Sequence, residues 1–449
     1  MRVKTDSDDT PEPCGEWDES GVWDQPYEPN PVNEAVFINL HHMSTFKAVN
    51  RVVDQLEPIV MGASNVSPKR KIVRKHLKLV ILNLYVAWKL WKWMIYSGGN
   101  GSYANKFKRY NRANITRQLA HTIRALRDAG YIDVKPGFQD TNTGKSFHSR
   151  AKATDKLIDL FTLLSPKMLQ TPRQRESIIL RVKVESDDGS GEIKKFQGYE
   201  DTSETMAMRG NLYRYNSIIH KKDIRLLLDV PGYNDDEIEV SSKFTYRVFN
   251  GTFDAGGRFY GPWWIGVPSV YRSFLRINGN QTVELDYSAQ HPTLVYARKG
   301  LALPDDPYTI GNHDRAVVKQ ALLTCLNATG RRKAWSAIQK WAYEKRLEAG
   351  DSSAFQVPPG LLDIIECVHH PIVDFFYTGA WTFLQRQDSE IAERIMNHFT
   401  AKGVPVLMIH DSFIVEQQYE DELREVMAAS MAQELERYAP GLKPRIKRA

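Results

Sequence analysis

Residues 405–416 have the sequence PVLMIHDSFIVE, in which two apolar runs flank the pair His410–Asp411. The pattern predicts two short buried strands joined by a tight turn. Placing charged side chains between two buried strands costs free energy unless those side chains have a binding partner. The turn therefore marks a candidate site, to which other parts of the sequence can contribute.

A second stretch, residues 282–288 with the sequence TVELDYS, predicts an apolar strand that carries Asp286 to its end. A helical pattern follows from His291 to Arg298, and Asp286 taken alone is better explained as the cap of that helix. Together, however, Asp286 and Asp411 on adjacent strand ends can hold two Mg²⁺ ions about 3.5–4 Å apart. We therefore predict a magnesium site, with Mn²⁺ as a substitute.

Between these two stretches, four residues recur at intervals of four along a predicted helix: Arg315, Lys319, Leu323 and Asn327. This spacing places them on one helix face. Arg315 and Lys319 could bind the phosphates of a nucleoside triphosphate. Its base could then stack on the flat surface that Leu323 and Asn327 provide. A surface helix with a basic stripe is the alternative explanation.

The composition is that of a globular protein. The chain has 449 residues, of which 42% are hydrophobic and 25% charged, and this excludes wholesale disorder or a fibre. Three cysteines and no CxxC pair exclude a disulfide framework and favour a reducing cytoplasm. The first residues lack the apolar core of a signal peptide. The most apolar run, residues 79–96, contains Asn83, Lys89 and Lys92 and predicts a buried or amphipathic helix. No membrane partner is expected.

The charges are unevenly distributed. Residues 1–40 carry ten acidic and two basic residues, a net charge of −8, whereas the whole chain has +6. This Pro-bearing segment predicts a flexible acidic tail. Residues 69–127 carry fifteen Lys or Arg and no acid. Such a basic block indicates a nucleic-acid partner, with a solvated basic face or a membrane-surface helix as the alternatives.

Residues 41–165 predict a mostly helical domain. A helix over residues 115–129 is followed by a short strand, a turn-rich excursion and a returning strand. This order resembles a winged helix, in which a helix enters the major groove of DNA and the wing touches the backbone. The alternative is a basic helix that packs against the catalytic body. Residues 166–242 predict a connecting subdomain. The candidate DNA contacts are Arg117, Arg124, Lys145 and Arg150.

Residues 243–449 contain an ordered series of short motifs. In chain order these are Asp254-x-x-Gly257-Arg258-x-Tyr260, Val267-Pro268, Asp286-Tyr287-Ser288, Asp306-Pro307-Tyr308, the Arg315-x3-Lys319 helix, Leu384-Gln385 and His410-Asp411-Ser412. The series resembles the palm and fingers of family A DNA polymerases and of the related phage-type single-subunit RNA polymerases. The resemblance covers less than half of the chain. It implies an α+β fold: a polymerase-type palm, which is an antiparallel sheet with helices, and reduced fingers, preceded by the winged-helix-like domain.

The resemblance also implies a role for each matched position. Asp286 and Asp411 would hold the two metal ions. Lys319 would meet the incoming triphosphate and protonate the leaving pyrophosphate, and Arg315 would bind its β- and γ-phosphates. Arg258 would contact the template or primer backbone, with Gln385 and His410 near the primer terminus. The remaining residues predicted to bind the substrate are Tyr287, His291, Leu323 and Asn327.

Some positions depart from the family pattern. His291 stands where the DNA polymerases keep a sugar-selecting Glu, and we expect its bulk to give a modest preference for dNTPs over NTPs. Leu323 and Asn327 stand where aromatic residues are usual, and Ser412 follows the RNA polymerase branch. Only 125 residues separate the two aspartates, so the fingers must be short.

These observations together predict a compact DNA-directed DNA polymerase of a phage, plasmid or integrated element. It would act in DNA replication on a DNA template and primer, with dNTPs and in some cases NTPs as substrates. Two other functions fit the same residues. One is a single-subunit RNA polymerase or primase, and the other is a non-catalytic DNA-binding replication initiator or regulator.

Overall fold

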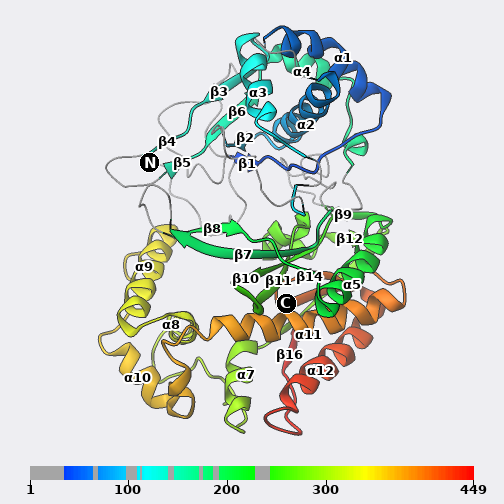
Figure 1. The fold of residues 1–449 in the computed structure, drawn as a ribbon. Helices are drawn as coiled ribbons and strands as arrows, with labels where there is room; N and C mark the ends of the chain where they lie inside the picture. The colour runs from blue at the N-terminus through cyan, green and yellow to red at the C-terminus, as the bar shows by residue number, and fades with distance from the viewer. Residues whose placement is uncertain are drawn as a thin grey trace.

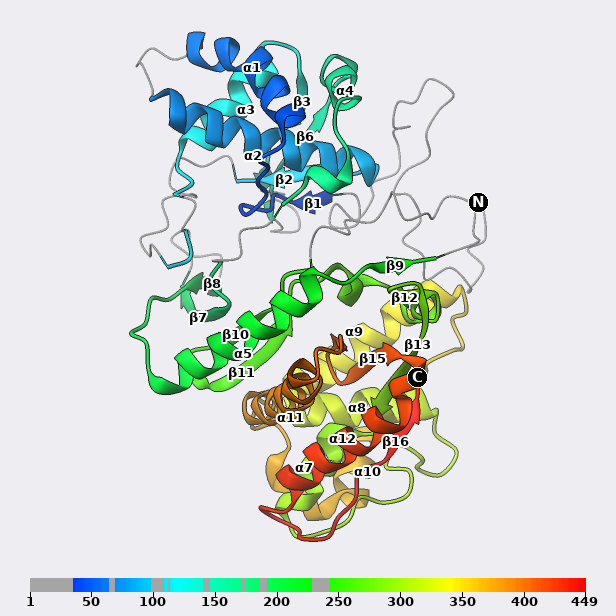
Figure 2. The ribbon, with the colours of Figure 1, turned by 90° about the vertical axis from the view of Figure 1, so that its right-hand side faces the viewer.

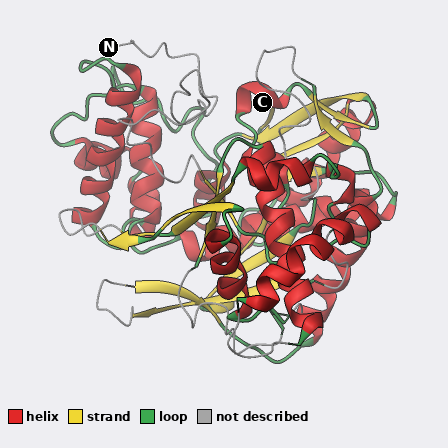
Figure 3. Ribbon diagram, turned by 90° about the horizontal axis from the view of Figure 1, so that it is seen from above, coloured by secondary structure: helices red, strands yellow, loops and turns green. Residues whose placement is uncertain are grey.

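The computed structural model describes residues 35–63, 69–97, 109–111, 114–139, 146–170, 175–185, 192–227 and 243–449. The predicted acidic tail lies outside these ranges except for residues 35–40, of which Ala35–Phe37 form strand β1. Figure 3 shows that the described chain is a mixed α+β structure. Most of its strand pairs are antiparallel, and the pairs β1–β2 and β7–β10 are parallel. No helix in the described ranges is long and apolar enough to cross a membrane.

The N-terminal part of the chain, residues 35–170, has its own hydrophobic core. Its first sheet has the strand order β1-β2-β6-β3, and β2, β6 and β3 are antiparallel neighbours. The elements are β1, α1 (Lys47–Gly62), α2 (Arg70–Lys89), β2 (Trp93–Tyr96), α3 (Gln118–Asp128), β3 (Ile132–Lys135), β4 (Phe138–Gln139), β5 (Ser146–Phe147), β6 (Ser149–Ala153), α4 (Asp155–Phe161) and η1 (Pro166–Met168).

The apolar periodicity of the sequence accounts for the helices of this part. Val73, Leu77, Val80 and Leu84 of α2 are fully buried, as their spacing predicts. The helix predicted over residues 115–129 is α3, which is three residues shorter at its start and one at its end. The predicted strand, excursion and returning strand are β3, the short β4–β5 hairpin and β6.

The predicted connecting segment is built into the body of the protein. Strands β7 (Ile178–Glu185) and β8 (Glu192–Phe196) join a sheet of order β11-β10-β7-β8, so they share it with strands of residues 243–449. Helix α5 (Ser203–His220) and strand β9 (Ile224–Leu226) follow. One hydrophobic core runs from Ile178 to Ala439.

The central sheet of residues 243–449 carries the candidate site. Its order is β14-β15-β13-β12-β9, and β16 also pairs with β13. The elements of this region are β10 (Tyr246–Asn250), β11 (Thr252–Tyr260), η3 (Trp263–Gly266), α6 (Ser269–Arg272), β12 (Leu275–Ile277), β13 (Asn280–Tyr287), α7 (Gln290–Arg298), α8 (Arg315–Asn327), α9 (Arg331–Ala349), α10 (Leu361–Val368), η4 (His370–Phe375), α11 (Trp381–Ala401), β14 (Leu407–Ile409), β15 (Ser412–Glu416), η5 (Gln417–Tyr419), α12 (Glu420–Leu435) and β16 (Ile446–Arg448).

Helix α11 lies against β11, and glycine permits the contact. Gly257 has a φ of +85°, and an added Cβ would lie 2.7 Å from the Phe249 ring and 2.9 Å from the Ser389 hydroxyl. The fully buried Arg247 supports the same contact, because its guanidinium donates to the Gly257 carbonyl and to the Ser389 hydroxyl. This packing fixes the backbone immediately before Arg258.

The N-terminal part sits on one side of the body, next to β7, β8 and β9, as two perpendicular views agree (Figures 1 and 2). Arg109, which precedes α3 in the chain, pairs with Glu176 at 2.9 Å and with Asp201 at 3.0 Å. The neighbouring Tyr110 hydroxyl donates to the Gln197 carbonyl at 2.7 Å. These contacts dock the segment before α3 onto the body.

Candidate active site

The two aspartates predicted from the sequence lie at neighbouring strand ends. Strands β13 and β15 are antiparallel, with Asp286 opposite Ser412, so that Asp411 lies one residue beyond the pair. His410 and Asp411 form the two-residue turn between β14 and β15. Both aspartates line one cavity of about 630 Å³.

The turn that presents Asp411 has an unusual backbone. His410 has a φ of +56°, in the left-handed region that favours glycine at this position of a two-residue hairpin. Histidine adopts this conformation more often than most residues do, although it still costs free energy. Ala289, which also lines the cavity, has a φ of +54°. Left-handed residues of this kind cluster at functional sites.

In the metal-free protein, the surroundings of Asp286 disfavour its ionised form. Burial and, after it, the nearby Asp411 raise the pKa of Asp286 to about 6, while Lys447 acts in the opposite direction. The Lys447 Nζ lies 3.7 Å from the Asp286 Oδ2. A bound cation would relieve the repulsion between the two carboxylates.

The donor chemistry of the site fits Mg²⁺. The candidate ligands are the pair Asp286 and Asp411, which line one cavity. Among the described residues, no group of three or more His, Cys, Asp or Glu side chains is arranged to hold a metal ion. Mg²⁺ is commonly bound by one or two carboxylates together with water and substrate phosphates. An open cavity with two carboxylates provides that combination.

Helix α8 brings the predicted cations to the same cavity. Asp314 caps the helix by accepting from the backbone amides of Ala316 and Val317. Arg315, Lys319, Leu323 and Asn327 all line the cavity, as their four-residue spacing predicts. The helix thus presents two cations and then two uncharged side chains along one face.

The Arg315 guanidinium is already held by a carboxylate. Its Nε donates to the Asp306 Oδ2 at 2.7 Å and its Nη2 to Oδ1 at 3.2 Å. This contact lowers the pKa of Asp306 to about 2. Tyr308 lies beneath both α8 cations, with its ring centroid 5.2 Å from Arg315 and 5.9 Å from Lys319. The Asp306–Tyr308 segment therefore positions the basic face of α8.

Arg258 and His291 form a second polar contact in the cavity. The Arg258 Nε donates to the Asp388 Oδ2 at 2.8 Å, and its Nη2 lies 3.4 Å from the His291 Nε2. Because arginine can only donate, Nε2 is the acceptor and the imidazole proton is on Nδ1. Burial, with Arg258 nearby, lowers the pKa of His291 to about 4, so the ring is neutral at physiological pH.

Two predicted site residues, Tyr287 and Gln385, do not present their side chains to the cavity as the others do. Tyr287 borders the cavity, but its side chain is buried and its hydroxyl donates to the Met427 carbonyl at 2.6 Å. Gln385 is half-buried on α11 and is not among the residues that line the cavity. The residue of α11 that reaches the site is Asp388, through Arg258.

The candidate DNA contacts of the N-terminal part are on a separate surface. Arg117 and Arg124 are exposed at the start and middle of α3. Arg150 is half-buried on β6. Lys145 lies outside the described residues, as does part of the basic block over residues 69–127.

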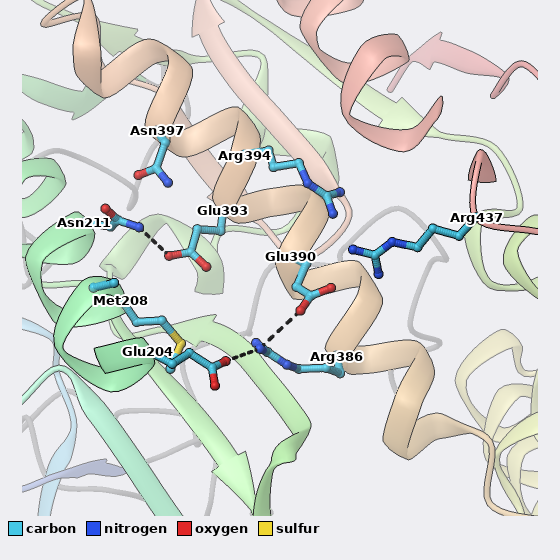
Figure 4. Close-up of a pocket in the computed structure, with 10 residues that line it drawn as sticks. Glu204, Met208, Asn211, Arg386, Glu390, Glu393, Arg394, Asn397 and Arg437 are labelled. Atoms are coloured by element: carbon cyan, nitrogen blue, oxygen red, sulfur yellow. Dashed lines mark hydrogen bonds and ion pairs between the residues drawn. The ribbon is translucent and has the colours of Figure 1, made fainter. Parts of the chain in front are cut away.

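A second hollow, of about 380 Å³, lies between α5 and α11 (Figure 4). Its charges are paired with one another: Arg386 contacts Glu204 and Glu390, and Asn211 donates to Glu393. Arg394 and Arg437 both pair with the buried Glu434. These contacts join α5, α11 and α12 around the hollow.

The sequence reasoning missed three residues of the site: Asp388, Arg445 and Lys447. Strand β16 brings Arg445 and Lys447 to the cavity wall. A signal was present in the sequence, because residues 443–449 contain four basic residues in seven and Arg445 and Lys447 are two apart. Residues two apart on a strand share one face. Asp388 carries no comparable local signal.

Comparisons with known proteins add little to this geometry. No family model and no curated protein matches the chain. Among solved structures, the chain is similar to the POL domain of Pol1 from M. smegmatis in complex with DNA primer-template and dNTP. The match has 10% sequence identity and a TM-score of 0.25, and covers 91% of this chain and 66% of that chain. A TM-score this low supports no argument about function.

The raised pKa of Asp286 predicts a stability change in the substitution Asp286→Asn. The pKa is about 6 in the folded protein and 3.8 ordinarily, so the folded state binds the proton more tightly. Stability therefore falls as the pH rises from about 4 to 6, and the ionised side chain destabilises the metal-free protein above that range. At pH 7.5 in EDTA, we expect Asp286→Asn to melt about 1–3 °C higher than the wild type, with no difference at pH 4.

Glu425→Gln, which changes an exposed carboxylate of α12 away from the cavity, is the control and should leave the melting temperature unchanged. Calorimetry at both pH values measures the effect. A lower melting temperature for Asp286→Asn at pH 7.5 would show that the charge is stabilised by its surroundings.

Proposed function

We propose that this protein is a template-directed nucleotidyltransferase, and specifically a compact DNA polymerase that extends a DNA primer with dNTPs by a two-metal mechanism. The observation that carries the proposal is the convergence of Asp286 and Asp411 with the α8 cations Arg315 and Lys319 in one cavity. Carboxylates on the sheet and cations on the facing helix form a site of opposite charges. A metal-bound polyphosphate has the complementary charge pattern.

In this proposal, Asp286 and Asp411 hold the Mg²⁺ ions. Bound Mg²⁺ would supply activation of the primer hydroxyl and neutralisation of the charge on the transferred phosphate. The protein contributes by positioning and by fixed charge, as in other phosphoryl transfers. Lys319 is exposed on the cavity wall and can donate a proton or a hydrogen bond to the leaving pyrophosphate.

Arg315 would bind the outer phosphates while keeping its present contact. The pair with Asp306 uses its Nε and Nη2, which leaves Nη1 available for a phosphate oxygen. The carboxylate fixes the plane of the guanidinium, so less side-chain freedom is lost when the nucleotide binds. Arg258, held by Asp388, would present its charge to the template or primer backbone.

A primer-extension assay tests this function. With a labelled DNA primer–template and Mg²⁺, the wild type should add dNTPs. Asp286→Asn and Asp411→Asn should each lower the rate by roughly 10²–10³-fold or more, because each substitution removes a metal ligand. Glu425→Gln should behave as the wild type. Retained DNA binding in all three variants separates a loss of chemistry from a loss of folding.

The same assay distinguishes the other functions. Synthesis from NTPs without a primer would favour the RNA polymerase or primase function. Tight DNA binding without any incorporation by the wild type would contradict the enzymatic proposal and favour a replication initiator or regulator.

The choice of sugar is proposed to depend on His291. The ring is neutral and its Nε2 faces Arg258, and His291 lies in the first turn of α7, where Pro292 is tolerated. A ring fixed in this way should crowd a 2′-hydroxyl. For His291→Ala we expect kcat/KM for an NTP to rise about tenfold relative to the matching dNTP. If NTP use falls instead, the histidine binds the hydroxyl, and RNA synthesis becomes the better assignment.

The N-terminal part is proposed to be a winged-helix-like DNA-binding domain. The supporting observations are the antiparallel order β2-β6-β3, the position of α3 directly before β3, and the β4–β5 hairpin between β3 and β6. In this proposal α3 enters the major groove and presents Arg117 and Arg124, which are both exposed.

Salt titration tests the role of α3. If Arg117 and Arg124 bind phosphates, the variant Arg117→Ala/Arg124→Ala should bind duplex DNA more weakly. The slope of log K against log salt should fall by about 0.9 for each phosphate that the variant no longer neutralises. Fluorescence anisotropy between 50 and 200 mM salt, roughly the range in which such interactions are resolved, gives the slope. Arg51→Ala, an exposed arginine on α1, is the matched control, and an unchanged slope in the α3 variant would assign the helix a structural role.

A further inference from the structure

Strand β16 places a lysine next to the candidate metal ligands. Lys447 pairs in register with Asp286, and its Nζ lies 3.7 Å from the Asp286 Oδ2. At this distance the two groups form an ion pair but are too far apart for a hydrogen bond. The side chain of Lys447 is 59% exposed, whereas that of Asp286 is 24% exposed. The ammonium group is therefore close to the carboxylate and still able to move.

The backbone that carries Lys447 is fixed on both sides. The Ser288 amide donates to the Arg445 carbonyl at 2.9 Å, and the Ala449 amide donates to the Glu284 carbonyl at 3.1 Å. Arg424 donates to the Ile446 carbonyl at 3.1 Å. The position of the Lys447 Cα is thus set by the sheet, and only its side chain has freedom.

The other cations of the cavity are mostly engaged. Arg258 is held by Asp388 and Arg315 by Asp306. Arg445 donates to the carbonyls of residues 303 and 304 and pairs with Asp305. Within the described part of the chain, the two cavity cations that donate no hydrogen bond to a protein carboxylate are Lys319 and Lys447. They come from α8 and β16, and both line the same cavity.

From this arrangement we infer that Lys447 is a positioning residue with two successive contacts. In the metal-free protein it is the counter-cation of Asp286. When Mg²⁺ neutralises Asp286, the ammonium group is released to bind a phosphate oxygen of the nucleotide. This inference rests on the proposed nucleotidyltransferase function and names a residue of its triphosphate site.

The two contacts predict effects of opposite sign when the charge is removed. Mg²⁺ competes with Lys447 for Asp286, so loss of the ammonium group should strengthen metal binding in the absence of nucleotide. The same loss removes a charge-assisted interaction with phosphate, so nucleotide binding should weaken. If Lys447 merely supported the fold, its substitution would weaken both metal binding and nucleotide binding.

The test compares Lys447→Met and Lys447→Arg with Lys443→Met, which changes an exposed lysine of the same segment outside the cavity. Mn²⁺ binding is measured by electron paramagnetic resonance without nucleotide. For Lys447→Met we expect Mn²⁺ to bind about 2–5-fold more tightly, the scale of an exposed ion pair. In primer extension, its KM for dNTP should rise about tenfold with little change in kcat. Lys447→Arg should stay close to the wild type in KM, and Lys443→Met should match it in both measurements.

Weaker Mn²⁺ binding together with a higher KM would overturn the inference in favour of a structural role. An unchanged KM in Lys447→Met, with an active wild type, would also overturn it and leave the proposed function intact. A wild type that binds Mn²⁺ but neither binds nor incorporates dNTPs would instead refute the proposed function, and with it the interaction with phosphate.

Discussion

The antiparallel pairing of β13 with β15 is the constraint on which the site depends. By setting Asp286 opposite Ser412, it brings two carboxylates together that repel each other. Cations of the cavity lie near that charge: Lys447 lies against Asp286, and α8 lines the same cavity with two cations. The repulsion is costly for a protein that uses the cavity only for packing, and it is useful to one that binds divalent metal ions there.

Local patterns predicted the parts of this site that are local in the chain. The hairpin around His410–Asp411 follows from two apolar runs with a charged break, and the common face of Arg315, Lys319, Leu323 and Asn327 follows from helical spacing. The helix predicted over residues 115–129 was likewise correct to within three residues at its ends. In each case the interactions that form the element lie within one turn or one hairpin. The helix predicted over residues 79–96 was wrong at its end, because α2 stops at Lys89 and residues 93–96 form strand β2.

Contacts between distant segments could not be predicted in this way. Lys447 reaches Asp286 only because β16 returns to pair with β13, and Asp388 reaches Arg258 only because α11 packs on β11 through Gly257. A contact of the same kind crosses the predicted boundary at residues 242 and 243. Strand β7 of the predicted connecting segment pairs with β10 of the predicted catalytic part. Strand partners far apart in sequence leave no periodic signal in either strand.

The docking of Arg109 and Tyr110 onto the body has a geometric consequence. Both residues precede α3, and both are bound to the sheet that contains β7 and β8 or to the segment before α5. Tyr110 lies eight residues before Gln118, the first residue of α3, so the anchor limits how far the start of the helix can lie from the body. If α3 binds a DNA sequence, as proposed, the nucleotide that enters the cavity would lie within a limited number of base pairs of that sequence.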